Sequence, residues 1–211
     1  EALLMVNVGD NIGGLENATS SIISALKGFN IAAEDSVEVA KKINDMYNEV
    51  SNTMAVDTGS LAKGVQRSSA VLNQAGVSME KTIGLLTGAY EVLQNMERSS
   101  VGLSTISQRL RGLEEDGTAI DGLSAKLEGA FNDLGLTLMG TNGQIKDTYT
   151  ILGELAEIYP TLTDNQRAYI GELTSGKNRA PVLQAILSNW ENVEKATETA
   201  INSAGSAAKE N

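Results

Sequence analysis

The stretch AGVSMEKTIGLLTGAYEVLQ, residues 75–94, constrains the fold because it combines helical spacing with very small side chains. Gly84 and Gly88 stand four residues apart within it. Such a pair brings helices together in membranes only inside an apolar segment of about twenty residues, and Glu80, Lys81 and Glu91 interrupt this one. We therefore expect close helix packing in water. The large apolar residues recur at helical spacing: Met79, Ile83, Leu86, Tyr90 and Leu93.

This predicted helix follows another one closely. Gly76 can take the left-handed conformation that ends many helices, and Ser78 is a good N-cap for the next. The earlier helix is predicted to start at Asp57 or Thr58, both N-cap candidates. The two helices then form a helical hairpin. The apolar side of the earlier helix consists of Leu61, Val65 and Leu72.

Three more segments before residue 114 show the same spacing and predict helices. The apolar positions of the first are Leu15, Ala18, Ile22, Leu26 and Phe29. Those of the second are Val37 or Ala40, then Ile43, Tyr47 and Val50. Those of the third are Leu103, Ile106, Leu110 and Leu113.

The remainder of the chain also reads as mainly helical. A short helix is predicted to end at Pro160, and Thr163 with Gln166 forms a capping box that starts the next. Gly176 is predicted to end that helix, and a last one is predicted from Ala180. Pro181 suits its first turn. The apolar side of the last helix consists of Leu183, Ile186, Leu187, Trp190 and Val193.

One β candidate interrupts this pattern. Apolar and polar residues alternate around Leu136 and Leu138, and the turn sequence Thr141-Asn142-Gly143 follows. We expect a small β-hairpin or an irregular turn near residues 134–147. The predicted fold class is all-α, a multi-helix array of short amphipathic helical hairpins. Its parts are an N-terminal bundle of about five helices (1–113) and a second helical part (114–211).

Composition fits closely approaching helices. The chain has 21 Gly but one Trp, two Phe and five Tyr, so a core must come from Leu, Ile, Val, Met and Ala. The first residue is not Met, and the last residues are mostly Ala, Ser, Glu and Lys. We expect a piece of a longer protein, whose tail needs a partner or a continuation.

Charge and missing residue types exclude several functions. Sixteen Lys and Arg against 27 Asp and Glu give a net charge of −11, which should repel nucleic acid. The absence of His and Cys removes the usual general base, thiolate nucleophiles and common transition-metal ligands.

The remaining chemical motifs are incomplete. Glu114, Glu115 and Asp116 lack the ligand spacing of a calcium loop, and Gly176-Lys177 lacks the upstream glycines of a phosphate loop. We predict no catalytic, cofactor or metal site and no enzyme activity. The residues that we single out are structural, for helix packing, capping and turns: Gly76, Ser78, Gly84, Gly88, Gly143, Thr163, Gln166 and Gly176.

Several segments, taken in order, resemble the core domain of phage tail tape measure proteins of Gram-positive phages and prophages. The first three are AAEDSVEVAKKIN (32–44), AGVSMEKTIGLL (75–86) and SVGLSTISQRLRGL (100–113). The others are GTNGQIKDTYTILGELA (140–156), LTDNQRAYIGELTSGKNRAPVLQAIL (162–187) and NSAGSAAKEN (202–211).

The resemblance implies a structural protein of the virion tail, assembled in the bacterial cytoplasm. Such a protein lies in the tail lumen, sets tail length and leaves during DNA ejection. It also implies the tail tube protein, the tail tip or baseplate hub and tail assembly chaperones as partners, and self-association in the tail. Specific nucleic-acid binding is not implied, and membrane contact is confined to ejection.

Two other readings stay open. One is a membrane-active helical module that acts at the host envelope during genome delivery and would permeabilise lipid vesicles. The other is a fragment of a lytic enzyme, which would cleave peptidoglycan.

Overall fold

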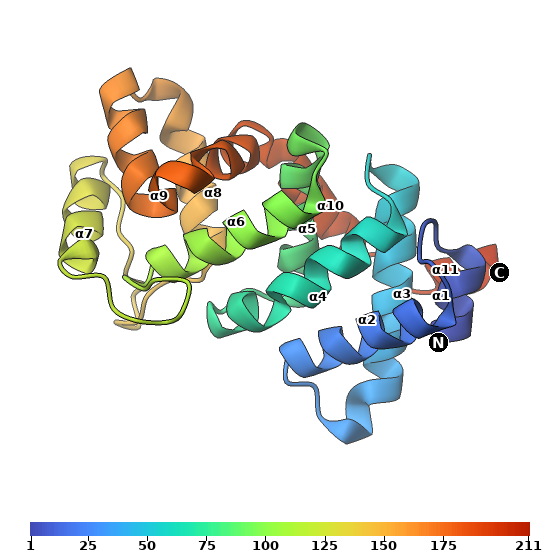
Figure 1. The fold of residues 1–211 in the computed structure, drawn as a ribbon. Helices are drawn as coiled ribbons and strands as arrows, with labels where there is room; N and C mark the ends of the chain where they lie inside the picture. Colours follow the sequence, from blue (N-terminus) through green and yellow to red (C-terminus); the bar gives the residue numbers. More distant parts are fainter.

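A computed structural model describes all 211 residues. It contains eleven α-helices and no β-sheet, so the all-α prediction is confirmed (Figure 1). Two short 3₁₀ turns, Ala33–Asp35 and Tyr159–Thr161, precede helices. The helices are α1 (Ala2–Val8), α2 (Leu15–Gly28), α3 (Ser36–Thr53), α4 (Thr58–Gln74), α5 (Met79–Leu93), α6 (Met96–Arg109), α7 (Leu123–Asp133), α8 (Thr148–Ile158), α9 (Asp164–Ser188), α10 (Trp190–Ile201) and α11 (Ser206–Glu210).

The helices form an elongated array around α5. Helices α4, α6 and α10 all pack on α5, and the pairing of α5 with α10 is the most extensive in the molecule. Helices α1, α2, α3 and α11 gather toward one end, and α7, α8 and α9 toward the other (Figure 1). Both termini lie at the first end, where the Asn7 amide donates to the Asn211 side chain at 3.0 Å.

One core extends through the array. A single cluster of 45 buried apolar residues includes members from both predicted parts of the chain, on either side of residue 113. The predicted stripes supply many of its residues: Ile43, Tyr47 and Val50 of α3 are fully buried, as are Ile83 and Leu86 of α5. The helices approach one another closely at glycines, as the composition predicted: a Cβ atom added to Gly64 or Gly102 would collide with the side chain opposite it.

Some predicted positions differ in detail. Leu15 is 54% exposed and Val37 is 75% exposed, because each lies in the first turn of its helix, beyond the packed face. Near residues 134–147, a single antiparallel bridge joins Met139 to Ile145, so the segment is a turn closed by one bridge rather than a hairpin of strands.

The C-terminal region requires two corrections. The helix predicted to begin at Ala180 begins earlier, directly after Gly176, so Pro181 lies beyond its first turn. This helix also ends at Asn189, where a continuous helix was predicted. The tail does not lack a partner, because α10 and α11 fold back onto α5 and α3. Two helices, α1 and α7, were not predicted at all.

Candidate functional site

The small-residue positions of α5 form a close seam with α10. A Cβ atom added to Gly84 would collide with the hydroxyl of Thr197 and would lie 2.7 Å from the carbonyl oxygen of Val193. A Cβ atom on Gly88 would collide with the Val193 side chain. Gly84 and Gly88 therefore serve a helix contact within the chain.

Glycine and an N-cap fix the turn before α5. Gly76 has φ +74°, and a Cβ atom there would lie 3.2 Å from the Cβ atom of Asp147. The Ser78 hydroxyl accepts from the Lys81 backbone N–H at 3.3 Å and caps the helix. The turn thus lies against the start of α8, which Asp147 caps.

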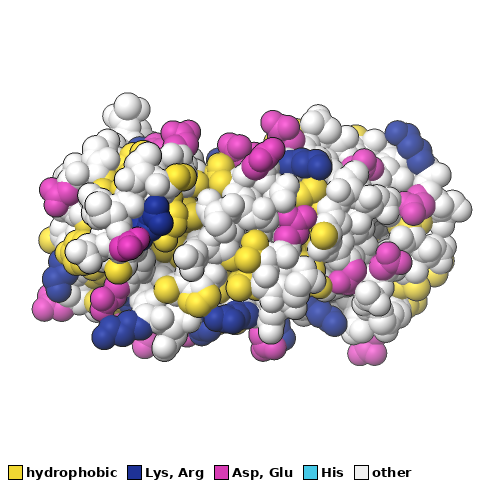
Figure 2. Space-filling view, turned by 90° about the horizontal axis from the view of Figure 1, so that it is seen from above, with side chains coloured by type: hydrophobic (Ala, Val, Ile, Leu, Met, Phe, Trp, Pro, Cys, Tyr) yellow, Lys and Arg dark blue, Asp and Glu magenta, His cyan; other side chains and the backbone are white.

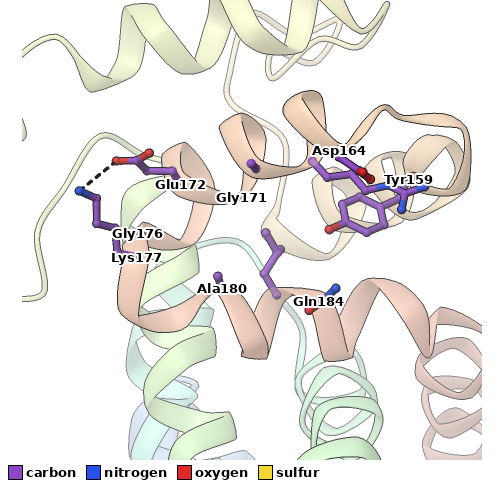
Figure 3. Close-up of a pocket in the computed structure, with 11 residues that line it drawn as sticks. Tyr159, Asp164, Gly171, Glu172, Gly176, Lys177, Ala180 and Gln184 are labelled. Atoms are coloured by element: carbon purple, nitrogen blue, oxygen red, sulfur yellow. Dashed lines mark hydrogen bonds and ion pairs between the residues drawn. The ribbon is translucent and has the colours of Figure 1, made fainter.

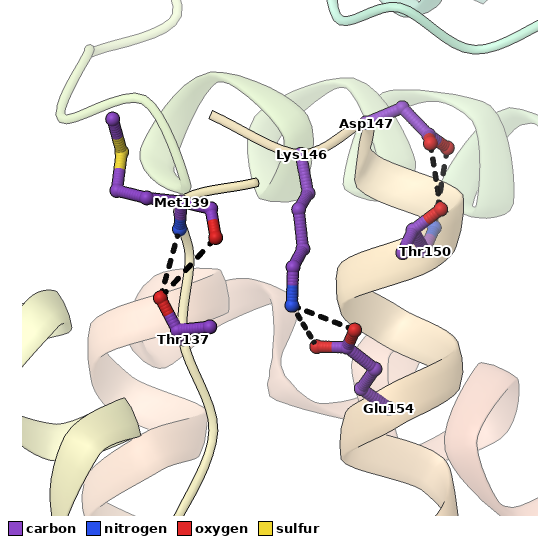
Figure 4. A network of polar contacts seen from close by, with 6 residues as sticks. All are labelled: Thr137, Met139, Lys146, Asp147, Thr150 and Glu154. Atoms are coloured by element: carbon purple, nitrogen blue, oxygen red, sulfur yellow. Dashed lines mark hydrogen bonds and ion pairs between the residues drawn. The ribbon is translucent and has the colours of Figure 1, made fainter. Parts of the chain in front are cut away.

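Polar contacts hold the loop before α8 to that helix (Figure 4), and an ion pair links the loop to α5. The Lys146 ammonium bonds both carboxylate oxygens of Glu154 at 2.7 Å. Asp147 accepts from the Thr150 backbone N–H and hydroxyl at 3.1 and 2.6 Å and pairs with Lys81 at 3.4 Å. Burial lowers the pKa of nearby Arg111, and the charge of Asp147 opposes that shift.

Gly143 forms the tip of the loop. Its φ is +74°, and its N–H donates to the Gly140 carbonyl oxygen at 3.0 Å. The Asn142 side chain accepts from the Gln144 N–H at 3.0 Å and closes the turn. The hydrogen bonds of residues 140–144 are all within the turn, so these residues shape the loop that leads to Lys146 and Asp147.

The start of α9 is held by the predicted capping box. The Thr163 hydroxyl accepts from the Gln166 backbone N–H at 3.3 Å. In return, the Gln166 side chain accepts from the Thr163 N–H at 2.9 Å. These bonds satisfy backbone donors that the first helical turn would otherwise leave free.

Gly176 breaks α9 into two helical halves, 164–175 and 177–188. It has φ +67° and ψ 169°. Arg109 of α6 donates to the carbonyl oxygens of Glu172 and Leu173, each at 3.2 Å, and thereby caps the first half. A cation at this position also suits the negative end of the helix dipole.

The break opens a cleft of about 510 Å³ between the two halves (Figure 3). Three of its charged groups are already engaged: Lys177 lies 3.9 Å from Glu172, and Arg167 donates to the carbonyl oxygens of Tyr159 and Pro160. The lining residues are Tyr159, Asp164, Arg167, Ala168, Gly171, Glu172, Gly176, Lys177, Ala180, Leu183 and Gln184.

A second polar cluster, not predicted from the sequence, binds the C-terminal segment to α3. The buried Asp45 carboxylate accepts from the Gly205 and Ala207 backbone N–H groups at 2.8 and 3.1 Å. Ser206 donates to Glu49 at 2.6 Å and accepts from Asn48 at 2.9 Å. We call this cluster the α3 latch. No signal in the sequence points to it, because Asp45, Asn48 and Glu49 have the polar character of an ordinary solvated helix face.

Residues of α3 also hold the side chain of Glu210, the last acidic residue of the chain. Asn52 and Asn48 donate to Glu210 at 2.7 and 2.8 Å, and these two bonds lower the pKa of Glu210.

Other acidic residues serve the loop after α6. The Glu115 carboxylate accepts from the Thr105 hydroxyl at 2.7 Å and lies 3.5 Å from Arg179. Asp116 accepts from Thr118, which lowers the pKa of its carboxyl group. No cluster of three or more acidic residues has the geometry to hold a metal ion, and none of the helices combines the length and apolar character that crossing a bilayer requires.

Comparison with protein families shows which family the chain resembles. Residues 1–173 match a family model described as phage-related minor tail protein. No solved structure matches the chain.

Proposed function

The chain belongs to the family of phage-related minor tail proteins, and we propose that it is part of a tape measure protein. In this proposal the protein occupies the tail lumen, sets tail length during assembly in the host cytoplasm and leaves during DNA ejection. Membership of the family makes the chain a structural component of the virion tail. The role in setting tail length goes beyond family membership and is the part that we propose.

The observation that carries the proposal is the ordered set of tape-measure-like segments within the matched residues. Four of the six lie wholly inside residues 1–173, and a fifth begins there. They fall on different helices, from α3 to α9, and so extend over most of the array. An ordered set of this length is more specific than any one of its short helical patterns.

Surface charge supports a place in a DNA-conducting tube. Acidic side chains are spread along the whole face drawn in Figure 2, with basic ones between them. The net charge of −11 disfavours adhesion to passing DNA. We propose a structural role without catalysis and without specific nucleic-acid binding.

The partners in this proposal are other tail proteins. They are the tail tube protein, the tail tip or baseplate hub and the tail assembly chaperones, together with further copies of the chain. Helix faces, rather than a catalytic cleft, would make these contacts. Membrane contact would be restricted to ejection.

Tail length in the electron microscope tests the proposal. About 100 residues of helical sequence would be duplicated in frame downstream of this region in the parent gene. Because a helix rises 1.5 Å per residue, tails should lengthen by about 150 Å. Insertion of the same segment into another tail gene is the control. Unchanged tails with the duplication retained would overturn the ruler role and favour the envelope-active alternative.

A further inference from the structure

Sequence and structure disagree at Asn189. The apolar residues on either side of it continue one helical stripe, from Leu183 to Val193, and no Gly or Pro stands between Pro181 and Gly205. Local sequence therefore favours one continuous helix. The structure instead ends α9 at Ser188 and starts α10 at Trp190, with Asn189 at φ −117° and ψ 28°.

Contacts from other parts of the chain hold this bend. The Asn189 side-chain amide donates to the Gly88 carbonyl oxygen and to the Glu91 carboxylate, each at 3.0 Å. Its own oxygen accepts from the Asn192 side chain at 3.0 Å. Two of the three bonds reach α5, so the bend depends on α10 remaining seated there.

The segment beyond the bend is attached by small and polar groups. Val193, Ala196 and Ala200 are the buried apolar residues of α10, and Ala207 is that of α11. The α3 latch adds hydrogen bonds but no large apolar side chain. The pairing of α10 with α5 is extensive, but it is made by small side chains, and an element with so little apolar burial can open locally more readily than the central helices unfold.

The surface that α10 covers has a shape that few other helices fit. Gly84 and Gly88 leave room for Thr197 and Val193, and the α3 latch accepts the backbone N–H groups of residues 205 and 207. These two contacts together specify the segment 190–211. A second copy of this chain carries the same segment and would fill the same surface.

We propose that Asn189 is a hinge through which two copies of the chain exchange α10 and α11. When it straightens, residues 177–201 become one helix of about 37 Å, at 1.5 Å per residue. The α10 and α11 helices of each copy then occupy the α5 seam and the α3 latch of the other. Such an exchange repeats existing contacts in a symmetric dimer.

Two substitutions at Asn189 distinguish the effect of helix propensity from the effect of losing the side-chain amide. Both Asn189→Ala and Asn189→Gly remove the side-chain bonds, but only Ala favours the straight helix. Light scattering at matched concentrations should give at least about fivefold more dimer for N189A, as the difference in helix propensity requires. Equal, purely monomeric behaviour of both variants would overturn the proposal.

Cysteine cross-linking tests exchange without altering the hinge. The chain has no Cys, so an Asn48→Cys copy and a mass-tagged Ser206→Cys copy can be refolded together. The side chains of these two positions bond at 2.9 Å. A disulfide between the two different copies is expected in the dimer fraction, increasing with refolding concentration. Absence of this mixed disulfide at every concentration would overturn the exchange.

Trp190 supplies an independent readout. The chain's one Trp stands next to the hinge and packs on Tyr149, with ring centroids 5.0 Å apart. Straightening should shift its fluorescence, whereas hydrogen exchange in α5 and α10 should stay slow because both helices remain paired. Rapid exchange in α5 of the dimer would mean that the seam is empty and would overturn the proposal.

Discussion

Glycines in these helices differ in what surrounds them. Gly84 and Gly88 face α10 so closely that no side chain fits without a shift, whereas Gly129 of α7 has no neighbouring atom within 4 Å of an added Cβ. Glycine weakens a helix through its backbone entropy. At Gly84 and Gly88 the close contact offsets that weakness, and at Gly129 nothing does.

Substitutions at two of these positions should therefore have opposite effects. Gly88→Leu forces Val193 aside and should destabilise the fold by about 1–3 kcal/mol, which lowers the melting temperature by several degrees. Gly129→Ala should stabilise by about 0.5–1 kcal/mol. Thermal melts followed by circular dichroism measure both. An unchanged melt for Gly88→Leu would contradict a tight seam.

Protonation of Glu210 should loosen the C-terminal segment. Its pKa is lowered in the folded chain by hydrogen bonds from Asn52 and Asn48, so the folded state favours the carboxylate. This stabilisation is present above the ordinary value of 4.5 and is lost as the pH falls through the lowered pKa. Hydrogen exchange of residues 203–211, corrected for intrinsic rates, should accelerate in that range.

The variant Glu210→Gln is the control for this titration. It should exchange faster than the wild type near neutral pH, and its local exchange should depend less on pH below 4.5. Identical pH profiles for the variant and the wild type would contradict the assignment to Glu210.

At the scale of single helices, side-chain caps were readable from the sequence. Thr163→Ala removes the hydroxyl that accepts from Gln166 and should destabilise the chain by about 1 kcal/mol. Thr163→Ser keeps a hydroxyl and should stay close to the wild type. Denaturant titration of the three proteins measures the difference. Equal midpoints for Ala and Ser would show that the cap contributes nothing to stability.

Helices could be predicted where residues close in sequence determine their start, their end and their apolar face. Helix α5 has a periodic stripe, the Ser78 cap and Gly76 before it, and the structure has a helix there. Helix α7 lacks a side-chain cap and begins after Gly122 in the left-handed conformation, so the sequence offered no start signal. The break at Asn189 depends on α5, more than 90 residues earlier in the chain, and local periodicity cannot reveal it.

The candidate sites were also predictable only in part. Gly84 and Gly88 could be recognised as packing residues, but not their partner, because Thr197 and Val193 belong to a segment distant in sequence. The α3 residues of the latch, Asp45, Asn48 and Glu49, look like an ordinary solvated helix face in the sequence, and only the structure shows that α11 covers them. Contacts between distant segments thus account for what periodicity missed.

For the whole molecule, the shared core predicts that the two parts need each other. Residues 1–113 alone would leave the Gly84 and Gly88 face of α5 uncovered, and Gly102 of α6 would lose its contact with Val182. We expect this fragment to melt broadly, without the cooperative transition of the whole chain. Adding the fragment 114–211 should restore that transition, because α9 and α10 can dock again.

A chain cut after folding provides the matched control. Gly117 lies in an exposed loop, has no atom within 4 Å of an added Cβ and connects the two parts. A protease site inserted there should give a nicked protein that stays associated and melts cooperatively, somewhat below the uncut chain because the link no longer restricts the unfolded state. If fragment 1–113 instead melted cooperatively at the temperature of the whole chain, the N-terminal helices would be an independent domain, and α10 would be an accessory to α5 rather than part of its core.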